Sequence, residues 1–241
     1  MNDRPTVHTD VRGGVGTVTF GEPPNNYLNI WLLTAINDAL LELDANPDCR
    51  ALVLRSEGKH FCAGRDFSAP RHPEDASELL YAEAARLFRI GKPWIALVQG
   101  GAIGSGFGLA AAADFRIAAS AAYFYPNFVK VGLHHGFGLT LTLPAIVGPH
   151  QARRALYLGE RIPAAEAQRM GLADTVIGDG DDLLAAGLGF ADRLASVPPA
   201  ALAAIRATCR KELTEAGYVA AVAHESAEQS RLRPAMPGTS R

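Results

Sequence analysis

Residues 100–114 read GGAIGSGFGLAAAAD and follow the apolar run 94–98, WIALV, after one residue, Gln99. Glycine stands at positions 100, 101, 104, 106 and 108. This pattern predicts a buried strand, a tight turn and then a helix whose first turn lies near Ser105 to Gly108. The N–H groups at a helix start favour negative charge, so the turn suits an oxyanion. Alternatively, the glycines only allow an alanine-rich helix to pack closely on a neighbour.

Common nucleotide-binding and hydrolase motifs do not fit this turn. The pattern GxGxxG does not match GSGFGL, and no acidic residue stands about 20 residues further on. The Walker lysine is absent. A GxSxG nucleophile elbow would need glycine at positions 103 and 107, which hold Ile103 and Phe107.

Composition limits the class of protein further. The 241 residues fit one domain, alone or with a small appended piece. The chain carries 23 basic and 25 acidic residues, and this balance disfavours a nucleic-acid partner. Its three cysteines form no CxxC pair, and no apolar run reaches the roughly 18 residues of a membrane span. We therefore expect a cytoplasmic protein with reduced thiols and no membrane partner.

The hydrophobic periodicity predicts alternating strands and helices, followed by helices alone. We expect a β-hairpin over 6–20, strands over 51–56, 93–99, 114–120 and 121–126, and helices over 29–47, 77–90, 144–160, 163–174, 181–197, 198–217 and 218–233. The chain thus divides into an α/β body, 1–180, and a C-terminal helical region, 181–241.

A second small-residue turn follows the predicted strand 51–56. Residues 58–68 read GKHFCAGRDFS. They follow the strand over 51–56 in the same way that the glycine-rich segment follows the strand over 93–99. Because parallel strands deliver their following turns to the same end of a sheet, we expect two backbone N–H donors, one from each turn, to converge.

The two turns together resemble motifs of a known family. FCAGRD, then KPWIALVQG, then GGAIGSGFGLAAAAD is similar to the pattern of the crotonase superfamily of enoyl-CoA hydratases and isomerases. The likeness runs from PNNYLNI through AAEAQRMGLAD to the helical tail. The resemblance implies an α/β fold, namely a crotonase-like spiral of β-β-α units with a C-terminal helical oligomerisation region. It also implies a homotrimer or a dimer of trimers.

The same resemblance implies the substrate and its contacts. The substrate would be an acyl-CoA thioester, with no other cofactor and no metal. Matched by position, the backbone N–H groups of Arg65 and Ser105 form the oxyanion hole for the thioester carbonyl. Further substrate or CoA contacts would come from Cys62, Ala63, Asp66, Gly104, Phe128 and Arg71. The resemblance also suggests that Arg210 and Lys211 reach the CoA phosphate of a neighbouring subunit.

The sequence departs from the hydratase pattern at the two catalytic glutamates. Their places are held by Gly108 and Phe128, neither of which can move a proton. Adding water to a double bond needs a general base and a general acid, so a non-standard reaction is expected. Isomerisation, hydrolysis or C–C cleavage would need fewer carboxylates. The alternative is a catalytically silent protein that binds acyl-CoA.

Three other side chains could replace the glutamates in proton transfer. His134 and His135 lie shortly after the second missing carboxylate, and histidine has an ordinary pKa near 6.5. Both imidazoles could instead cap the next helix or contact a neighbouring subunit. Tyr81 matches the place of a histidine base in the dehalogenase-like branch of the family, although it could simply line the acyl pocket.

Overall fold

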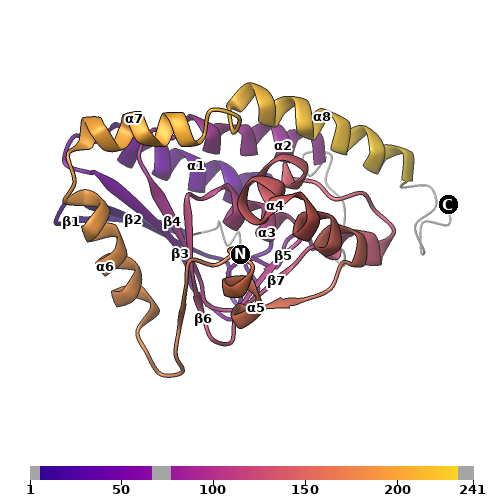
Figure 1. Ribbon diagram of the computed structural model, residues 1–241, viewed down its shortest axis with the longest axis horizontal. Helices are drawn as coiled ribbons and strands as arrows, with labels where there is room; N and C mark the ends of the chain where they lie inside the picture. The colour runs from indigo at the N-terminus through magenta and orange to yellow at the C-terminus, as the bar shows by residue number, and fades with distance from the viewer. Residues whose placement is uncertain (1–5, 67–76, 233–241) are drawn as a thin grey trace.

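A six-stranded sheet forms the centre of the protein, as the computed structural model of residues 6–66 and 77–232 shows (Figure 1). The strand order is β1-β2-β3-β4-β6-β9. The bounds are β1 Thr6–Arg12, β2 Val15–Gly21, β3 Ala51–Ser56, β4 Trp94–Val98, β6 Phe115–Ala119 and β9 Thr175–Ile177. Strands β1 and β2 form the expected antiparallel hairpin, and every other neighbouring pair is parallel.

The sheet is covered on both faces, which explains its continuously apolar strands. Successive strand residues point to opposite faces. Leu52 and Leu54 pack into the main core with α1 (Ile30–Ala45), whereas Ala51 and Val53 pack in a second cluster with side chains of α6 (Leu183–Ala195). Alternate residues of β3 therefore face α1 on one side of the sheet and α6 on the other.

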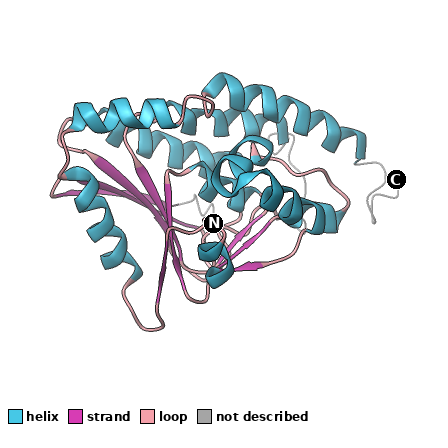
Figure 2. Cartoon of the chain, in the orientation of Figure 1, coloured by secondary structure: helices cyan, strands magenta, loops and turns pink. Residues whose placement is uncertain are grey.

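A smaller sheet and its helices lie beside the large sheet (Figure 2). Its order is β5-β7-β8, from Gly101–Ile103, Tyr123–Tyr125 and Ile162–Pro163. The associated helices are α3 Ser105–Ala112, η3 Asn127–Val131, α4 Leu139–Leu158 and α5 Ala164–Arg169. Helix α4 begins five residues before the expected helix over 144–160, and Gly148 interrupts it with φ of +76°. The break precedes Pro149, which disfavours helical dihedrals in the residue before it.

The C-terminal helices pass over the rest of the chain. Figure 1 shows α7 (Pro199–Cys209) and α8 (Glu215–Leu232) along one side, next to α1 and α2. Helix α2 covers Ser77–Ala84 and continues as the 3₁₀ helix η2, Ala85–Arg89, where a single helix over 77–90 was expected. None of the helices described is both long and apolar enough to cross a membrane.

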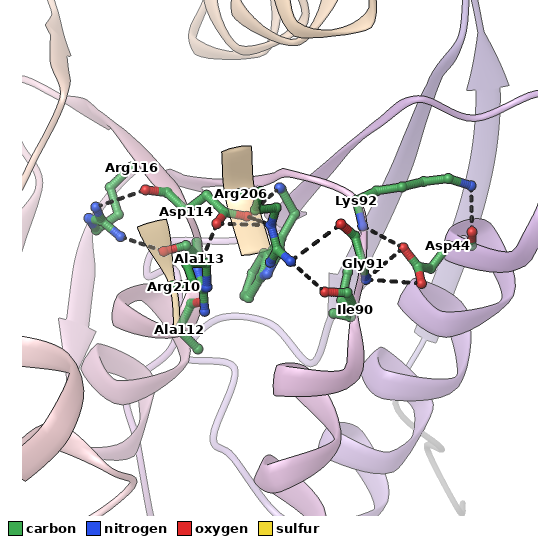
Figure 3. Close-up of polar contacts among 11 residues, drawn as sticks. Asp44, Ile90, Gly91, Lys92, Ala112, Ala113, Asp114, Arg116, Arg206 and Arg210 are labelled. Carbon is green, nitrogen blue, oxygen red and sulfur yellow. Dashed lines mark hydrogen bonds and ion pairs between the residues drawn. The ribbon is translucent and has the colours of Figure 1, made fainter. Parts of the chain in front are cut away.

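A charged cluster attaches α7 to the body of the protein (Figure 3). Asp114, just before β6, accepts hydrogen bonds from Arg206 (3.0 Å) and Arg210 (2.8 Å), and also from the backbone N–H of Trp94. Arg206 further donates to the carbonyl of Ile90. Both arginine side chains are only 13% exposed, so these ion pairs are partly buried.

Candidate functional site

The two small-residue turns lie side by side, as the sequence predicts. The Cys62 N–H donates to the Gly101 carbonyl at 3.1 Å, and the Ile103 N–H donates to the Cys62 carbonyl at 2.9 Å. Cys62 and Ala102 therefore pair as in a parallel sheet. The ends of β3 and β4 thus bring residues 62–64 and 101–105 into direct contact.

Glycines make this contact possible. A Cβ on Gly64 would lie 2.5 Å from the Ile103 carbonyl oxygen, and one on Gly106 would overlap the Cys62 carbonyl. Gly64 also has φ of +74°, which side chains rarely allow. The same Cβ position on Gly64 lies 3.5 Å from the Ser105 nitrogen. The glycines therefore allow the backbone of the first turn to lie directly against the backbone of the second.

The segment 25–28 fixes the first turn from its other side. The Leu28 N–H donates to the Gly64 carbonyl at 2.7 Å, and the Ala63 N–H donates to the Asn25 carbonyl at 3.0 Å. In a trans peptide the N–H points opposite to the preceding carbonyl. Since the Gly64 carbonyl faces Leu28, the Arg65 N–H points away from this segment.

Ser105 supplies the second N–H at a helix start. It is the first residue of α3, so its N–H has no acceptor within the helix. The preceding Gly104 has φ of +54°, and its N–H donates to the Tyr125 carbonyl at 2.9 Å. The residue before α3 is thus fixed by a hydrogen bond to β7.

Two aromatic rings lie near the start of α3, at the positions that the sequence resemblance matches to catalytic glutamates. A Cβ on Gly108 would lie only 2.5 Å from the Cβ of Phe137 and 2.6 Å from its Cδ1, so Phe137 covers that position. Phe128 lies on η3, and its Cζ is 3.8 Å from a Cβ built on Gly104. Both rings are buried. The α3 start therefore has apolar walls at both of these positions.

His134 and His135 lie in the loop between η3 and α4. Their rings stack with centroids 4.1 Å apart, and His224 of α8 meets His134 edge-on at 5.7 Å. The His134 Nδ1 is 2.7 Å from the His135 carbonyl, so this nitrogen carries a proton and donates. The His135 Nε2 is 2.8 Å from Thr140 Oγ1. Burial, together with His134 and His224, lowers the pKa of His135 to about 4.

Tyr81 lies beneath the same loop. Its hydroxyl accepts from Gln229 Nε2 of α8 at 2.9 Å, and the same amide donates to the His134 carbonyl. Tyr81 also lines a groove of about 440 Å³ between α2 and α8, together with Ala82, Val222 and Ser226 among others. The structure therefore links Tyr81 to the histidine loop through one α8 side chain.

Comparison with known proteins identifies the family. The enoyl-CoA hydratase/isomerase family model matches residues 10–232. The chain belongs to the enoyl-CoA hydratase/isomerase family. It is 36% identical over 228 residues to the Mycobacterium tuberculosis protein named Probable enoyl-CoA hydratase EchA14, covering 91% of this chain and 87% of that one. It is 30% identical over 206 residues to the carnitinyl-CoA dehydratase of Salmonella typhi, covering 83% and 78%.

A solved structure within the enoyl-CoA hydratase/isomerase family agrees with the fold. The enoyl-CoA hydratase of Mycobacterium avium subsp. paratuberculosis superimposes with a TM-score of 0.81 at 29% identity, covering 94% of this chain and 89% of that one. The expected fold class, a mixed α/β crotonase fold with C-terminal helices, is confirmed.

The other residues predicted to contact substrate or CoA differ in how far their side chains are buried. Cys62 is fully buried, which raises the pKa of its thiol to about 12 and makes it unreactive. Its backbone N–H and carbonyl are both used in pairing the turns, so Cys62 supports the site rather than lining it. Ala63, Arg65 and Asp66 are half-buried beside it. Arg71 lies outside the described residues.

Arg210 has partners within its own chain. Its guanidinium donates to Asp114 and to the Ala112 carbonyl. This pairing attaches α7 to the sheet. The predicted contact of Arg210 and Lys211 with the CoA of a neighbouring subunit stays a prediction. Within residues 6–66 and 77–232, no group of three or more His, Cys, Asp or Glu side chains is placed to hold a metal ion.

Sequence reasoning missed three residues of the site. Phe137 is an apolar residue in a loop with φ of +61°, which no local pattern predicts, although its two glycine neighbours were a signal of close packing. Glu225 and Gln229 of α8 reach the loop from about 90 residues away in sequence. Glu225 accepts from the N–H groups of Gly138 (2.8 Å) and Thr140 (2.9 Å), and burial raises its pKa.

Proposed function

We propose that this protein binds an acyl-CoA thioester and stabilises the enolate of its acyl group with the backbone N–H groups of Arg65 and Ser105. The pairing of the two glycine turns carries this proposal, because it brings the Arg65 turn against the free N-terminus of α3. Donors fixed in a water-poor site stabilise a developing oxyanion strongly, and losing one typically costs roughly 3 kcal/mol of barrier.

The relatives support the substrate class. Their names refer to enoyl-CoA and carnitinyl-CoA as substrates. In this proposal Ala63, Asp66, Gly104 and Phe128 border the thioester, and either Arg65 or Arg71 contacts the CoA phosphates. The CoA thioester is the substrate, and the reaction needs no further cofactor.

The reaction we propose does not use the paired carboxylates of hydration. Gly108 and Phe128 hold their places, and the rings of Phe137 and Phe128 fill the adjoining space. Isomerisation, hydrolysis or C–C cleavage through a thioester enolate fits better. His135, His134 and Tyr81 are the proposed proton-transfer residues, and His135 is uncharged at neutral pH because its pKa is lowered to about 4.

A second candidate is a protein that binds acyl-CoA without turning it over. The apolar walls beside Ser105 favour it, because no carboxylate stands at Gly108 or Phe128 to move a proton. The two candidates differ in one observable property. An enolate-stabilising enzyme exchanges the α-protons of a saturated acyl-CoA with solvent, whereas a silent binder does not.

The test combines calorimetry with α-proton exchange of butyryl-CoA in D₂O, followed by NMR. The matched variants are Ser105→Pro, which removes the N–H at the first helical position that proline tolerates, and Ser105→Ala, which keeps it. We expect exchange to fall about 100-fold in Ser105→Pro and to persist in Ser105→Ala. Binding without exchange in the wild type would select the silent binder, and absence of binding would refute both candidates.

A further inference from the structure

We propose that Glu225 and Thr140 hold the neutral His135 ring with its proton on Nε2, so that Nδ1 is the ring nitrogen that accepts a proton. This inference rests on the proposed function, in which His135 transfers a proton, and it assigns that step to one atom. Glu225 and Thr140 are positioning residues in this scheme, because both act through His135 and neither touches the substrate.

Glu225 of α8 accepts at both of its oxygens from the start of α4. Its Oε2 accepts from the Gly138 N–H at 2.8 Å, and its Oε1 accepts from the Thr140 N–H at 2.9 Å. Burial raises the pKa of this carboxyl group, and hydrogen bonds from the Thr140 side chain and from the two N–H groups oppose that rise. Gly138 is the N-cap of α4, so the positive end of the helix dipole also favours the anion. We therefore take Glu225 as ionised and able only to accept hydrogen bonds.

The Thr140 hydroxyl connects this carboxylate to His135. A hydroxyl has a single proton to donate, and the hydrogen bond from the Thr140 side chain to Glu225 uses it. The same Oγ1 lies 2.8 Å from the His135 Nε2. Because the hydroxyl proton is already committed, Oγ1 is the acceptor in this second hydrogen bond. The His135 Nε2 must then carry a proton.

The Nδ1 of His135 is left unprotonated. Burial, together with His134 and His224, lowers the pKa of His135 to about 4, so at pH 7 the ring is neutral and has one N–H. Within residues 6–66 and 77–232, no hydrogen bond engages this Nδ1. The side-chain atoms that are buried there without a partner belong to other residues, namely Glu22, Asn37, Trp94 and Tyr218. The Nδ1 of His135 is therefore accessible, and its lone pair is free to accept a proton.

Helix α8 fixes the backbone on both sides of His135. Gln229 donates to the His134 carbonyl at 2.9 Å, and Glu225 accepts from the Gly138 N–H. The His134 ring stacks on the His135 ring, and its Nδ1 donates to the His135 carbonyl. The direction of the free nitrogen is therefore set by the loop, and its protonation state is set by Thr140 and Glu225.

The first test determines the tautomer directly. NMR of protein with ¹⁵N in its histidine rings distinguishes protonated from unprotonated ring nitrogens at pH 7, and His135→Asn identifies the His135 signals among those of the seven histidines. Thr140→Val removes the hydroxyl but keeps the N–H that Glu225 accepts, whereas Thr140→Ser keeps both. Thr208→Val is the matched control, because Thr208 is an exposed threonine of α7.

The variants should differ in the state of His135. We expect a proton on Nε2 alone in the wild type, Thr140→Ser and Thr208→Val, and a mixture of the two tautomers in Thr140→Val. Glu225→Gln places an amide where the carboxylate was, so the Thr140 hydroxyl can accept from the amide and donate to Nε2. The tautomer with its proton on Nδ1 should therefore appear in Glu225→Gln.

The second test measures the exchange of the α-protons of butyryl-CoA in D₂O. Thr140→Val should slow this exchange about tenfold, because a poorly oriented base transfers protons slowly. Its affinity for butyryl-CoA, measured by calorimetry, should stay within twofold of the wild type. Thr140→Ser should restore the exchange rate, and Thr208→Val should leave it unchanged.

The opposite results overturn the proposal. A wild type with the His135 proton on Nδ1 would mean that Thr140 donates to the ring, and an identical tautomer in the wild type, Thr140→Val and Glu225→Gln would mean that neither residue sets it. If the tautomer changes as expected but Thr140→Val exchanges α-protons at the wild-type rate, Nδ1 is not the accepting nitrogen, while the proposed function stands. If the wild type exchanges no α-protons, the proton step fails together with the enzymatic function, whatever the tautomer.

Discussion

Gly108 and Gly189 are both glycines inside helices, yet their surroundings differ. Gly108 lies in α3 against Phe137, whereas a Cβ on Gly189 in α6 would meet nothing within 4 Å. We expect Gly108→Ala to destabilise the fold by about 1–3 kcal/mol through overpacking. Gly189→Ala should be neutral or stabilising by up to about 1 kcal/mol, because alanine favours a helix. Urea denaturation of both variants measures this difference, and equal stabilities would contradict the position of Phe137.

His135 makes stability depend on pH. Its folded-state pKa is lowered to about 4, below the roughly 6.5 of an unfolded chain, so the unfolded state takes up a proton more readily. This contribution to stability is fully present above about pH 6.5 and is lost as the pH falls through 4. It amounts to at most about 3 kcal/mol.

Denaturant titrations at pH 7.5 and 4.5 measure this effect. The stability of His135→Asn should fall less between these two pH values than that of the wild type. His8→Gln, a change at an exposed residue of β1, should behave as the wild type. An identical pH dependence in all three proteins would show that the pKa of His135 is not lowered in the folded protein.

At the scale of elements, the attachment of α7 to the rest of the protein depends on the carboxylate of Asp114. Asp114 faces both Arg206 and Arg210, and its side chain is 9% exposed. Removing one partner of a buried ion pair typically costs about 3–5 kcal/mol, because the other charge stays buried. We expect Asp114→Asn to approach the lower figure and to speed amide hydrogen exchange selectively in α7.

The matched control for α7 is Glu215→Gln, which removes the partner of Arg89 at the start of α8. That pair is largely exposed, so its loss should change stability little. Unchanged exchange in α7 of Asp114→Asn would mean that apolar packing, rather than the ion pairs, holds this helix.

The sequence predicts the elements far better than their side-chain contacts. The hairpin, the buried strands and most helices follow local periods, such as Leu33, Ile36 and Leu40 along α1. The 3₁₀ helix η2 and the early start of α4 depend on packing and were not predicted. The meeting of the two glycine turns was predicted, because parallel strands place their ends together.

The sequence does not predict contacts between segments that are far apart along the chain. Asp114 and Arg206 are 92 residues apart, and Tyr81 and Gln229 are 148 apart. No local pattern specifies such pairs. The cover of Gly108 by Phe137 is of the same kind, and it also needs a positive φ at a non-glycine residue.

At the scale of the whole molecule, we propose a homotrimer or a dimer of trimers. Val129 on η3 lies next to Gly159, just after α4, and Tyr157 and Leu158 of α4 are exposed. Adjacent exposed apolar residues of this kind often mark an interface. Light scattering after gel filtration should give three or six chains for the wild type.

A double variant tests whether this patch holds the assembly. Tyr157→Glu with Leu158→Glu should lower the mass towards one chain while the fold remains. Ile205→Glu is the matched control, because Ile205 is similarly exposed on α7, away from the patch. A monomeric wild type would contradict the assembly, and an unaffected double variant would place the interface elsewhere.

The cover of Gly108 by Phe137 also restricts the order in which this sequence can change. A side chain at position 108 and the present backbone and ring at position 137 cannot occupy the same space. An evolutionary path or a design that restores a carboxylate at 108 must therefore first alter residue 137. If position 108 changes first, the intermediate protein has a disrupted core. The effect of a substitution at position 108 therefore depends on the residue at position 137, although the two positions are 29 residues apart in the sequence.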